Sequence, residues 1–176
     1  MDWTRFYEMH AKELGEPSNF ARFVSEHVRP GDELVDLGAG NGKDVKYFKE
    51  KSIDAYGIDD AFESEDVIKL NVKDYIRKNP SPKYVYTRFF WHSIDRETQL
   101  SILDWTKDTL FIEARTSLDI PDNIFCNKKR NLVFVSELVK DLKSYGFDIV
   151  FATEGRGLSP FLQEDPHLIR IICKKI

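Results

Sequence analysis

The sequence of 176 residues contains few cysteines and no long apolar run. Its two cysteines, Cys126 and Cys173, make neither a disulfide framework nor a metal cluster, so we expect two reduced thiols. No stretch of about 18 consecutive apolar residues occurs, so no transmembrane helix is expected. The N-terminus has no basic region followed by an apolar run, and therefore no secretory signal is expected.

An excess of charge of one sign is also missing. The chain has 26 basic and 30 acidic residues, a net charge of −4, which predicts weak affinity for nucleic acid. With 41% hydrophobic and 13% aromatic residues, the composition is that of a folded protein rather than a disordered one. A chain of this length typically forms one domain, which we place over residues 18–176, after an aromatic segment at residues 1–17.

Apolar runs alternate with amphipathic stretches, which predicts an α/β fold with a largely parallel sheet. Seven strands are expected, at residues 33–37, 53–58, 67–70, 84–87, 110–114, 147–153 and 168–174. Helices are expected at residues 18–28, 43–51, 94–105 and 136–145, with Ser18 and Ser136 as N-caps and Gly146 as a stop. A glycine- and proline-containing loop at residues 155–167 joins the last two strands, which predicts an antiparallel C-terminal hairpin.

The most informative motif lies at residues 35–42, between an expected strand and an expected helix. Glycines at such a place let the backbone turn sharply and let a ligand approach without a side chain in the way. The dinucleotide-binding fingerprint needs glycines at relative positions one, three and six. Here Gly38, Gly40 and Gly42 occupy positions one, three and five, and Lys43 occupies the sixth. This spacing disfavours a nicotinamide cofactor.

An acid, Asp36, lies in the strand two residues before the first glycine. Together with the glycine spacing, it resembles the first motif of class I S-adenosylmethionine-dependent methyltransferases. The resemblance runs from about Ser18 to Lys174 and implies a Rossmann-like, seven-stranded, mostly parallel sheet with helices on both faces. It also implies S-adenosyl-L-methionine as cofactor, and the supply of that cofactor points to a cytoplasmic protein.

The family resemblance implies a role for individual residues. In the family, an acid at the place of Asp36 helps to hold the methionine amino group, and an acid at the place of Asp59 binds the ribose hydroxyls. Asn71 occupies the place of a side chain that contacts the adenine amino group, where an aspartate is common, and Val72 would offer a backbone N–H. The expected cofactor-binding residues are Asp36, Gly38, Ala39, Gly40, Asn41, Gly42, Asp59, Asp60, Asn71, Val72, Arg88 and Phe89.

A closer likeness lies downstream. The segment 86–94, YTRFFWHSI, resembles the SRFFLHAI-type segment of a small methyltransferase group that includes enzymes decorating surface glycans and related small molecules. Segments 111–116 and 164–170 fit the same group. At residues 122–130 the group carries an Asp-His-Tyr-Arg-Arg-like element, of which this chain keeps only the basic end. We therefore expect a small-molecule or glycan acceptor whose identity differs from those of the group.

Methyl transfer from a sulfonium centre requires the protein chiefly to align the acceptor and exclude water, because the cofactor is already activated. His92 is the candidate base if the acceptor carries a proton at the reacting atom; the alternative is a histidine bonded to backbone at a helix start. Arg88 and Arg115 are candidates to bind an anionic acceptor. The alternative for both is an ion pair with Glu113 or another local acid.

Ligands bind at the carboxyl ends of the strands in such sheets, so the residues there are expected to converge. These residues are Gly38, Asp59, Asn71, Arg88, Glu113, Arg115 and Glu154, with Arg156, Asp165 and His167 of the hairpin loop as further candidates. Asp44 is either a helix-dipole partner or a substrate contact. Trp3, Phe6 and Tyr7 belong either to a lid over the cofactor or to a core helix.

Three functions stay open on the sequence. The first is a methyltransferase, and the second is a catalytically inactive cofactor-binding subunit that serves protein interaction. The third is a nicotinamide-dependent reductase, which Lys43 and the short chain disfavour. The sequence gives no oligomeric state.

Overall fold

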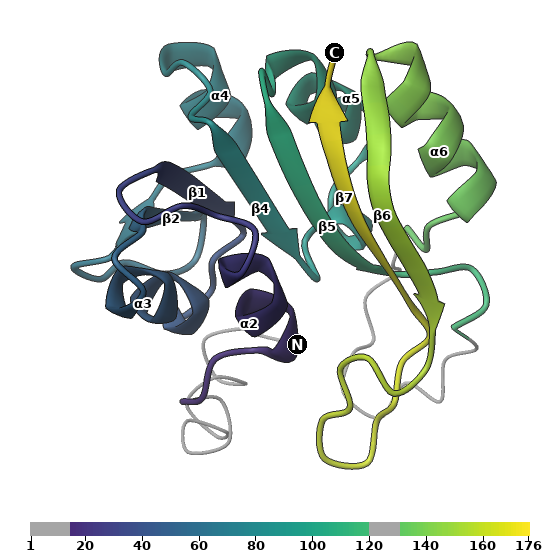
Figure 1. Ribbon diagram of the computed structural model, residues 1–176, viewed down its shortest axis with the longest axis horizontal. Helices are drawn as coiled ribbons and strands as arrows, with labels where there is room; N and C mark the ends of the chain where they lie inside the picture. Colours follow the sequence, from purple (N-terminus) through teal and green to yellow (C-terminus); the bar gives the residue numbers. More distant parts are fainter. Residues whose placement is uncertain (1–14, 120–130) are drawn as a thin grey trace.

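The computed structural model describes residues 15–119 and 131–176, in which seven strands form one mixed sheet (Figure 1). The strands are β1 Glu33–Leu37, β2 Asp54–Asp59, β3 Val67–Lys69, β4 Tyr84–Arg88, β5 Thr109–Arg115, β6 Phe147–Gly155 and β7 Leu168–Lys175. The helices are α2 Asn19–Ser25, α3 Lys43–Glu50, α4 Val72–Lys78, α5 Arg96–Trp105 and α6 Val135–Ser144, with a short 3-10 helix, η1, at Trp91–Ser93. The predicted Rossmann-like α/β fold is confirmed.

The strand order is β3-β2-β1-β4-β5-β7-β6. Strands β1 to β5 are parallel, whereas β7 runs antiparallel to both β5 and β6. The chain builds outward from β1 to β3 and then returns to place β4 on the other side of β1. Strand order therefore reverses between β1 and β4, which is where open α/β sheets bind their ligands.

Helices cover both faces of the sheet. On one face, α2 and α3 contribute Phe20, Val24, Val45 and Phe48 to a core with Leu34, Tyr86 and Phe111 of the strands. On the other face, α4, α5 and α6 pack Tyr75, Ile102, Leu103, Leu138 and Leu142 against Val35, Leu37 and their neighbours. A strand covered on both sides is largely apolar on both, which explains Leu34, Val35 and Leu37 of β1 and makes the buried Asp36 an exception. Within the described residues, no helix is long and apolar enough to cross a membrane.

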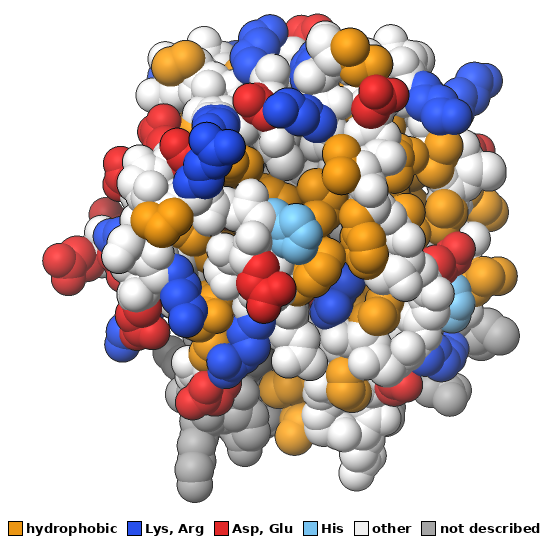
Figure 2. Space-filling view, in the orientation of Figure 1, with side chains coloured by type: hydrophobic (Ala, Val, Ile, Leu, Met, Phe, Trp, Pro, Cys, Tyr) orange, Lys and Arg blue, Asp and Glu red, His pale blue; other side chains and the backbone are white. Residues whose placement is uncertain are grey.

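The face with α2 and α3 is the one in view in Figures 1 and 2. Figure 2 shows acidic and basic side chains intermixed there, and hydrophobic side chains gathered where β5, β7 and β6 run in Figure 1. Phe23 of α2 contacts Phe151 of β6, with 5.0 Å between the ring centroids. The first described helix thus reaches from β1 towards the far edge of the sheet.

The structure corrects some local expectations. Ser18 does cap α2, because its hydroxyl accepts a 2.9 Å hydrogen bond from the Ala21 N–H, but the helix ends at Ser25 rather than near Val28. Ser136 is not an N-cap: α6 begins at Val135 and Phe134 holds the cap position without a side-chain hydrogen bond. Helix α4 was not predicted, since a seven-residue helix is too short for an apolar period to show.

Candidate functional site

The glycine loop follows β1 and is fixed to β2 by backbone hydrogen bonds. The N–H groups of Gly38 and Ala39 donate to the Ile58 carbonyl at 2.8 and 3.2 Å. Gly38, Gly40 and Gly42 have φ of +80°, +54° and +74°, a region that side chains disfavour. A Cβ atom at Gly38 would lie only 2.3 Å from Cδ2 of Phe90. Glycine is thus needed at position 38 because Phe90 leaves no room for a side chain there, whether or not a ligand is bound.

Asp59 ends β2 and binds the glycine loop. Its Oδ2 accepts a hydrogen bond from the Gly40 N–H at 2.9 Å. Its Oδ1 accepts from the N–H groups of Ala61 at 2.8 Å and Phe62 at 3.2 Å. A carboxylate offers about four lone-pair sites, so roughly one acceptor position of Asp59 is left for a ligand hydroxyl.

The predicted adenine contacts lie one strand further out. Asn71 is the N-cap of α4, and its side-chain oxygen accepts from the Lys73 N–H at 2.9 Å. Val72 is the first residue of α4 and is buried, whereas Asn71, Asp60 and Asn41 are exposed. The Leu70 N–H donates to the Asp59 carbonyl at 2.9 Å, which fixes the end of β3 beside the end of β2.

Asp36 lies inside the sheet beneath the glycine loop and is only 3% exposed. Among the described residues, its Oδ1 is the one buried side-chain nitrogen or oxygen without a hydrogen-bond partner. Burial raises the pKa of Asp36 well above its ordinary value, and the nearby carboxyl of Asp44 raises it further, while Arg88 acts in the opposite direction. A buried carboxyl oxygen without a partner is costly, which marks this place as built for something other than stability.

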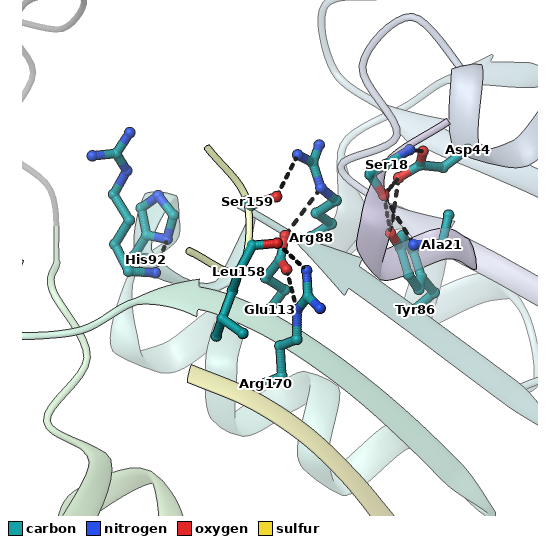
Figure 3. Close-up of polar contacts among 11 residues, drawn as sticks. Ser18, Ala21, Asp44, Tyr86, Arg88, His92, Glu113, Leu158, Ser159 and Arg170 are labelled. Atoms are coloured by element: carbon teal, nitrogen blue, oxygen red, sulfur yellow. Dashed lines mark hydrogen bonds and ion pairs between the residues drawn. The ribbon is translucent and has the colours of Figure 1, made fainter. Parts of the chain in front are cut away.

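For Asp44, the sequence left a helix-dipole partner and a substrate contact open, and the structure shows which groups it binds within the protein. Its Oδ1 accepts from the Ser18 N–H at 2.7 Å, and its Oδ2 accepts from the hydroxyls of Ser18 at 2.7 Å and Tyr86 at 2.8 Å (Figure 3). Its contacts are those of an anchor that ties the start of α2 to α3 and β4. Burial, together with Asp44, raises the pKa of the Tyr86 hydroxyl, which therefore stays a donor.

Arg88 ends β4 and forms a buried triad with Glu113 of β5 and Arg170 of β7 (Figure 3). Arg88 Nε donates to one Glu113 oxygen at 3.1 Å and Arg170 Nε to the other at 2.6 Å. Arg88 also donates to the Ser159 hydroxyl at 3.3 Å, and Arg170 to the Leu158 carbonyl at 2.7 Å. The triad, which we call the Arg–Glu–Arg clamp, holds the β6–β7 loop against the sheet.

Arg115 ends β5 and is likewise engaged. It donates to Asp119 at 2.9 Å and forms an ion pair with Glu164 of the β6–β7 loop. Its side chain is 11% exposed, and that of Arg88 is 20% exposed. The ion-pair alternative is therefore what the geometry shows for both arginines.

His92 lies in η1 and is 4% exposed. Its Nδ1 accepts a hydrogen bond from the Arg115 backbone N–H at 3.1 Å. In a neutral ring with Nδ1 as acceptor, the proton lies on Nε2, so the ring presents a donor rather than a basic lone pair. The backbone-bonded alternative is observed, and a catalytic role for His92 stays a prediction.

Phe89 follows β4 with φ of +54°, a conformation that side chains rarely adopt. Its N–H donates to the Glu113 carbonyl at 2.9 Å. The guanidinium of Arg88 lies 4.5 Å from the ring centroid and that of Arg115 lies 5.8 Å from it. The His92 ring packs edge-on at 5.9 Å. Phe89 therefore gathers the three predicted catalytic residues around one ring.

The β6–β7 loop is tied to the end of β5. The Asp165 carboxylate accepts from the Gly157 N–H at 2.7 Å, and Arg156 donates to the Asp165 carbonyl. Nδ1 of His167 lies 2.7 Å from the Thr116 hydroxyl, and the backbone N–H of His167 donates to Oδ1 of Asp119 at 3.0 Å. Oε1 of Glu154 in β6 lies 3.7 Å from Nδ1 of His167.

Some predicted residues and features lie elsewhere. Trp3, Phe6, Tyr7 and the segment 122–130 are outside the described residues. A cavity of about 620 Å³ lies between the starts of α5 and α6, lined by Trp91, Gln99, Phe134 and neighbouring residues, and it includes none of the predicted site residues. Within residues 15–119 and 131–176, no group of three or more histidine, cysteine or acidic side chains could hold a metal ion.

Sequence reasoning missed two side chains that shape the site. Tyr86 and Phe90 are in the motif at residues 86–94 but received no role. Tyr84, Tyr86 and Arg88 alternate along one face of β4, and this period was the available signal for Tyr86. No sequence signal predicts that Phe90 lies over Gly38.

The fold is that of class I S-adenosylmethionine-dependent methyltransferases. A methyltransferase structure from Archaeoglobus fulgidus superposes with a TM-score of 0.68 and 19% identity, covering 97% of this chain and 99% of that one. The 1,6-didemethyltoxoflavin-N1-methyltransferase of Burkholderia thailandensis, solved with 1,6-didemethyltoxoflavin and S-adenosylhomocysteine, gives 0.71 and 15%, covering 99% and 84%. A TehB-like methyltransferase of Corynebacterium glutamicum gives 0.69 and 12%, covering 98% and 95%. The sequence matches no protein-family model and no curated protein.

Proposed function

We propose that the protein is an S-adenosylmethionine-dependent methyltransferase acting on a small molecule or glycan. The observation that carries the proposal is Asp36, a buried carboxyl with an unpartnered oxygen beneath a glycine loop, at the place where strand order reverses. The methionine part of the cofactor carries an ammonium group, which would donate a charged hydrogen bond to this oxygen. The fold and the cofactors bound by its structural neighbours support this proposal.

The residues suit the cofactor in the following way. Asp36 would hold the methionine amino group, and the loop from Gly38 to Gly42 would line the methionine and ribose parts. Asp59 would bind a ribose hydroxyl with the acceptor position that its three backbone hydrogen bonds leave. Asn71 and Val72 would flank the adenine. When bound, the cofactor supplies an activated methyl group on a sulfonium centre, and the protein aligns the acceptor with it.

The acceptor side would be formed by Phe89, the ends of β4 and β5, and the β6–β7 loop. The guanidiniums there are ion-paired with carboxylates: Arg88 and Arg170 with Glu113, and Arg115 with Asp119 and Glu164. Because these guanidiniums are already paired, the site favours an uncharged polar acceptor over a strongly anionic one. His92, whose ring packs edge-on against Phe89, would lie on this acceptor side.

Isothermal titration with S-adenosylmethionine and S-adenosylhomocysteine tests the cofactor assignment, with NADH as the control ligand. We expect both adenosyl compounds to bind and NADH to give no heat. Absence of binding by both would contradict the proposal.

A second candidate is a cofactor-binding subunit without catalysis. The engaged Nδ1 of His92 and the ion-paired Arg88 and Arg115 favour it, because these three predicted catalytic residues already bind other groups of the protein. Transfer of a radiolabelled methyl group into metabolite and glycan extracts separates the two, since a binding subunit would label nothing.

The proposed enzyme would act in the cytoplasm, where its cofactor is made.

A further inference from the structure

Two carboxyl groups, Asp36 and Asp44, lie in the buried space under the glycine loop. Among the described residues, three donor groups reach Asp44, whereas Oδ1 of Asp36 has none. Both are nearly inaccessible, at 3% and 5% exposure. Tyr86 lies directly opposite Asp36 in the β1–β4 register, yet its hydroxyl donates to Asp44. Ser18 gives both its N–H and its hydroxyl to Asp44 as well. These donors therefore hydrogen-bond to Asp44 and not to Oδ1 of Asp36.

The charges around Asp36 come from each element packed against it. Helix α3 brings Asp44, the end of β2 brings Asp59, and β4 brings Tyr86 and Arg88. Arg88 is the cation among them, and Glu113 already pairs with it. Burial, Asp44 and Asp59 all raise the pKa of Asp36. An isolated carboxylate in such surroundings is more stable with a proton than with its charge.

We propose that Asp36 carries a proton in the ligand-free protein and exchanges it for the ammonium group of S-adenosylmethionine, so that cofactor binding releases one proton. In this exchange the O–H bond of the carboxylic acid breaks and its proton passes to the buffer. The ligand's ammonium group keeps its own protons and donates to the carboxylate that remains. The inference rests on the proposed function and concerns how its cofactor is held.

The sign of the pH dependence follows from the exchange. A cation beside Asp36 lowers the pKa of its carboxyl in the complex, so the complex binds fewer protons than the free protein. Affinity therefore rises with pH between the pKa of the complex and that of the free protein, by up to about tenfold per pH unit for one proton. Above the pKa of the free protein, the affinity no longer changes with this group.

The test is isothermal titration between about pH 5.5 and 6.7, at least about one unit below the pKa of about 7.7–8.0 expected for an α-amino group such as the ligand's. Titrations in MES and in Bis-Tris, which both buffer in this range and differ in ionisation enthalpy, count the protons released. The probes are S-adenosylmethionine, S-adenosylhomocysteine and 5′-methylthioadenosine, which lacks the amino-acid part. We expect up to one proton for the first two, none for the third, and affinity for the first two that rises with pH.

Asp36→Asn removes the titrating group while keeping its shape, and Asp54→Asn is the matched control. Asp54 is exposed at the amino end of β2, away from the glycine loop. We expect no proton release and a flat pH profile in Asp36→Asn, and wild-type behaviour in Asp54→Asn. The comparison with 5′-methylthioadenosine uses the wild-type protein, so the test stands if Asp36→Asn does not fold.

The outcomes separate the two proposals. If neither S-adenosylmethionine nor S-adenosylhomocysteine binds at any pH, the proposed function fails. If they bind without releasing protons, or if release persists in a folded Asp36→Asn protein, the proton exchange is wrong and the proposed function stands.

Discussion

Glu113→Gln is expected to destabilise the protein strongly, because Glu113 is the centre of the Arg–Glu–Arg clamp. Glu113 is fully buried and accepts hydrogen bonds of 3.1 and 2.6 Å from Arg88 and Arg170. Glutamine keeps the shape but turns an amide NH₂ towards one of the two guanidiniums and leaves two cations without their counter-charge. Removing one partner of a buried ion pair costs about 3–5 kcal/mol. For a protein of this size, each kcal/mol lowers the melting temperature by about 2–4 °C.

Urea denaturation followed by circular dichroism measures the loss, with Glu97→Gln as the control. Glu97 pairs with Lys73 on the surface with 78% of its side chain exposed, so its replacement should change stability by less than about 1 kcal/mol. Hydrogen exchange adds a local measurement, because the clamp holds Leu158 and Ser159. We expect faster exchange in the β6–β7 loop of Glu113→Gln. A loss below about 1 kcal/mol, with unchanged exchange in the loop, would refute the reasoning.

The remaining predictions concern the cofactor and the chemistry. Gly40→Val should abolish S-adenosylmethionine binding in titration calorimetry, because φ at Gly40 is +54° and a side chain there would enter the loop; retained affinity would show that the loop does not contact the ligand. Asp59→Ala should weaken cofactor binding by about 1–3 kcal/mol through lost charged hydrogen bonds, and unchanged affinity would mean that the ribose assignment is wrong. His92→Ala should bind cofactor nearly normally but transfer radiolabelled methyl groups more slowly, and full activity would remove His92 from the reaction.

Much of the fold was predictable because the signals are local. The short segment at 33–37, with three apolar residues after a turn, predicted β1 with its observed bounds, and the serine before an amphipathic stretch predicted the start of α2. The same reasoning failed at Ser136, because the cap position is held by Phe134, before the polar residue that was predicted to cap the helix. Helix α4 was not predicted because it is short and largely polar, so its buried residues, Val72 and Tyr75, do not form a recognisable apolar period.

The site was predictable only in part. The spacing of Asp36 and the glycines comes from one short segment, so it can be read directly. Most partners of Arg88, His92 and Arg115 cannot, since Glu113, Ser159, the Arg115 N–H and Glu164 lie 23 to 71 positions away in the chain. Asp119, the other partner of Arg115, is the local exception. Which acid neutralises which arginine depends on the order of the strands, and that order places Arg170 of β7 beside Glu113 of β5.

The position of β7 also affects how the molecule is assembled. It follows β6 in the chain, yet it is inserted between β5 and β6, and Cys173 meets Leu110 across 63 positions. During vectorial synthesis, β6 therefore emerges before β7, the strand with which it pairs, and its backbone lacks that partner until β7 has been made. Such distant pairing makes registry between the last strands a late step, and an interruption of translation after residue 167 would leave β6 prone to self-association.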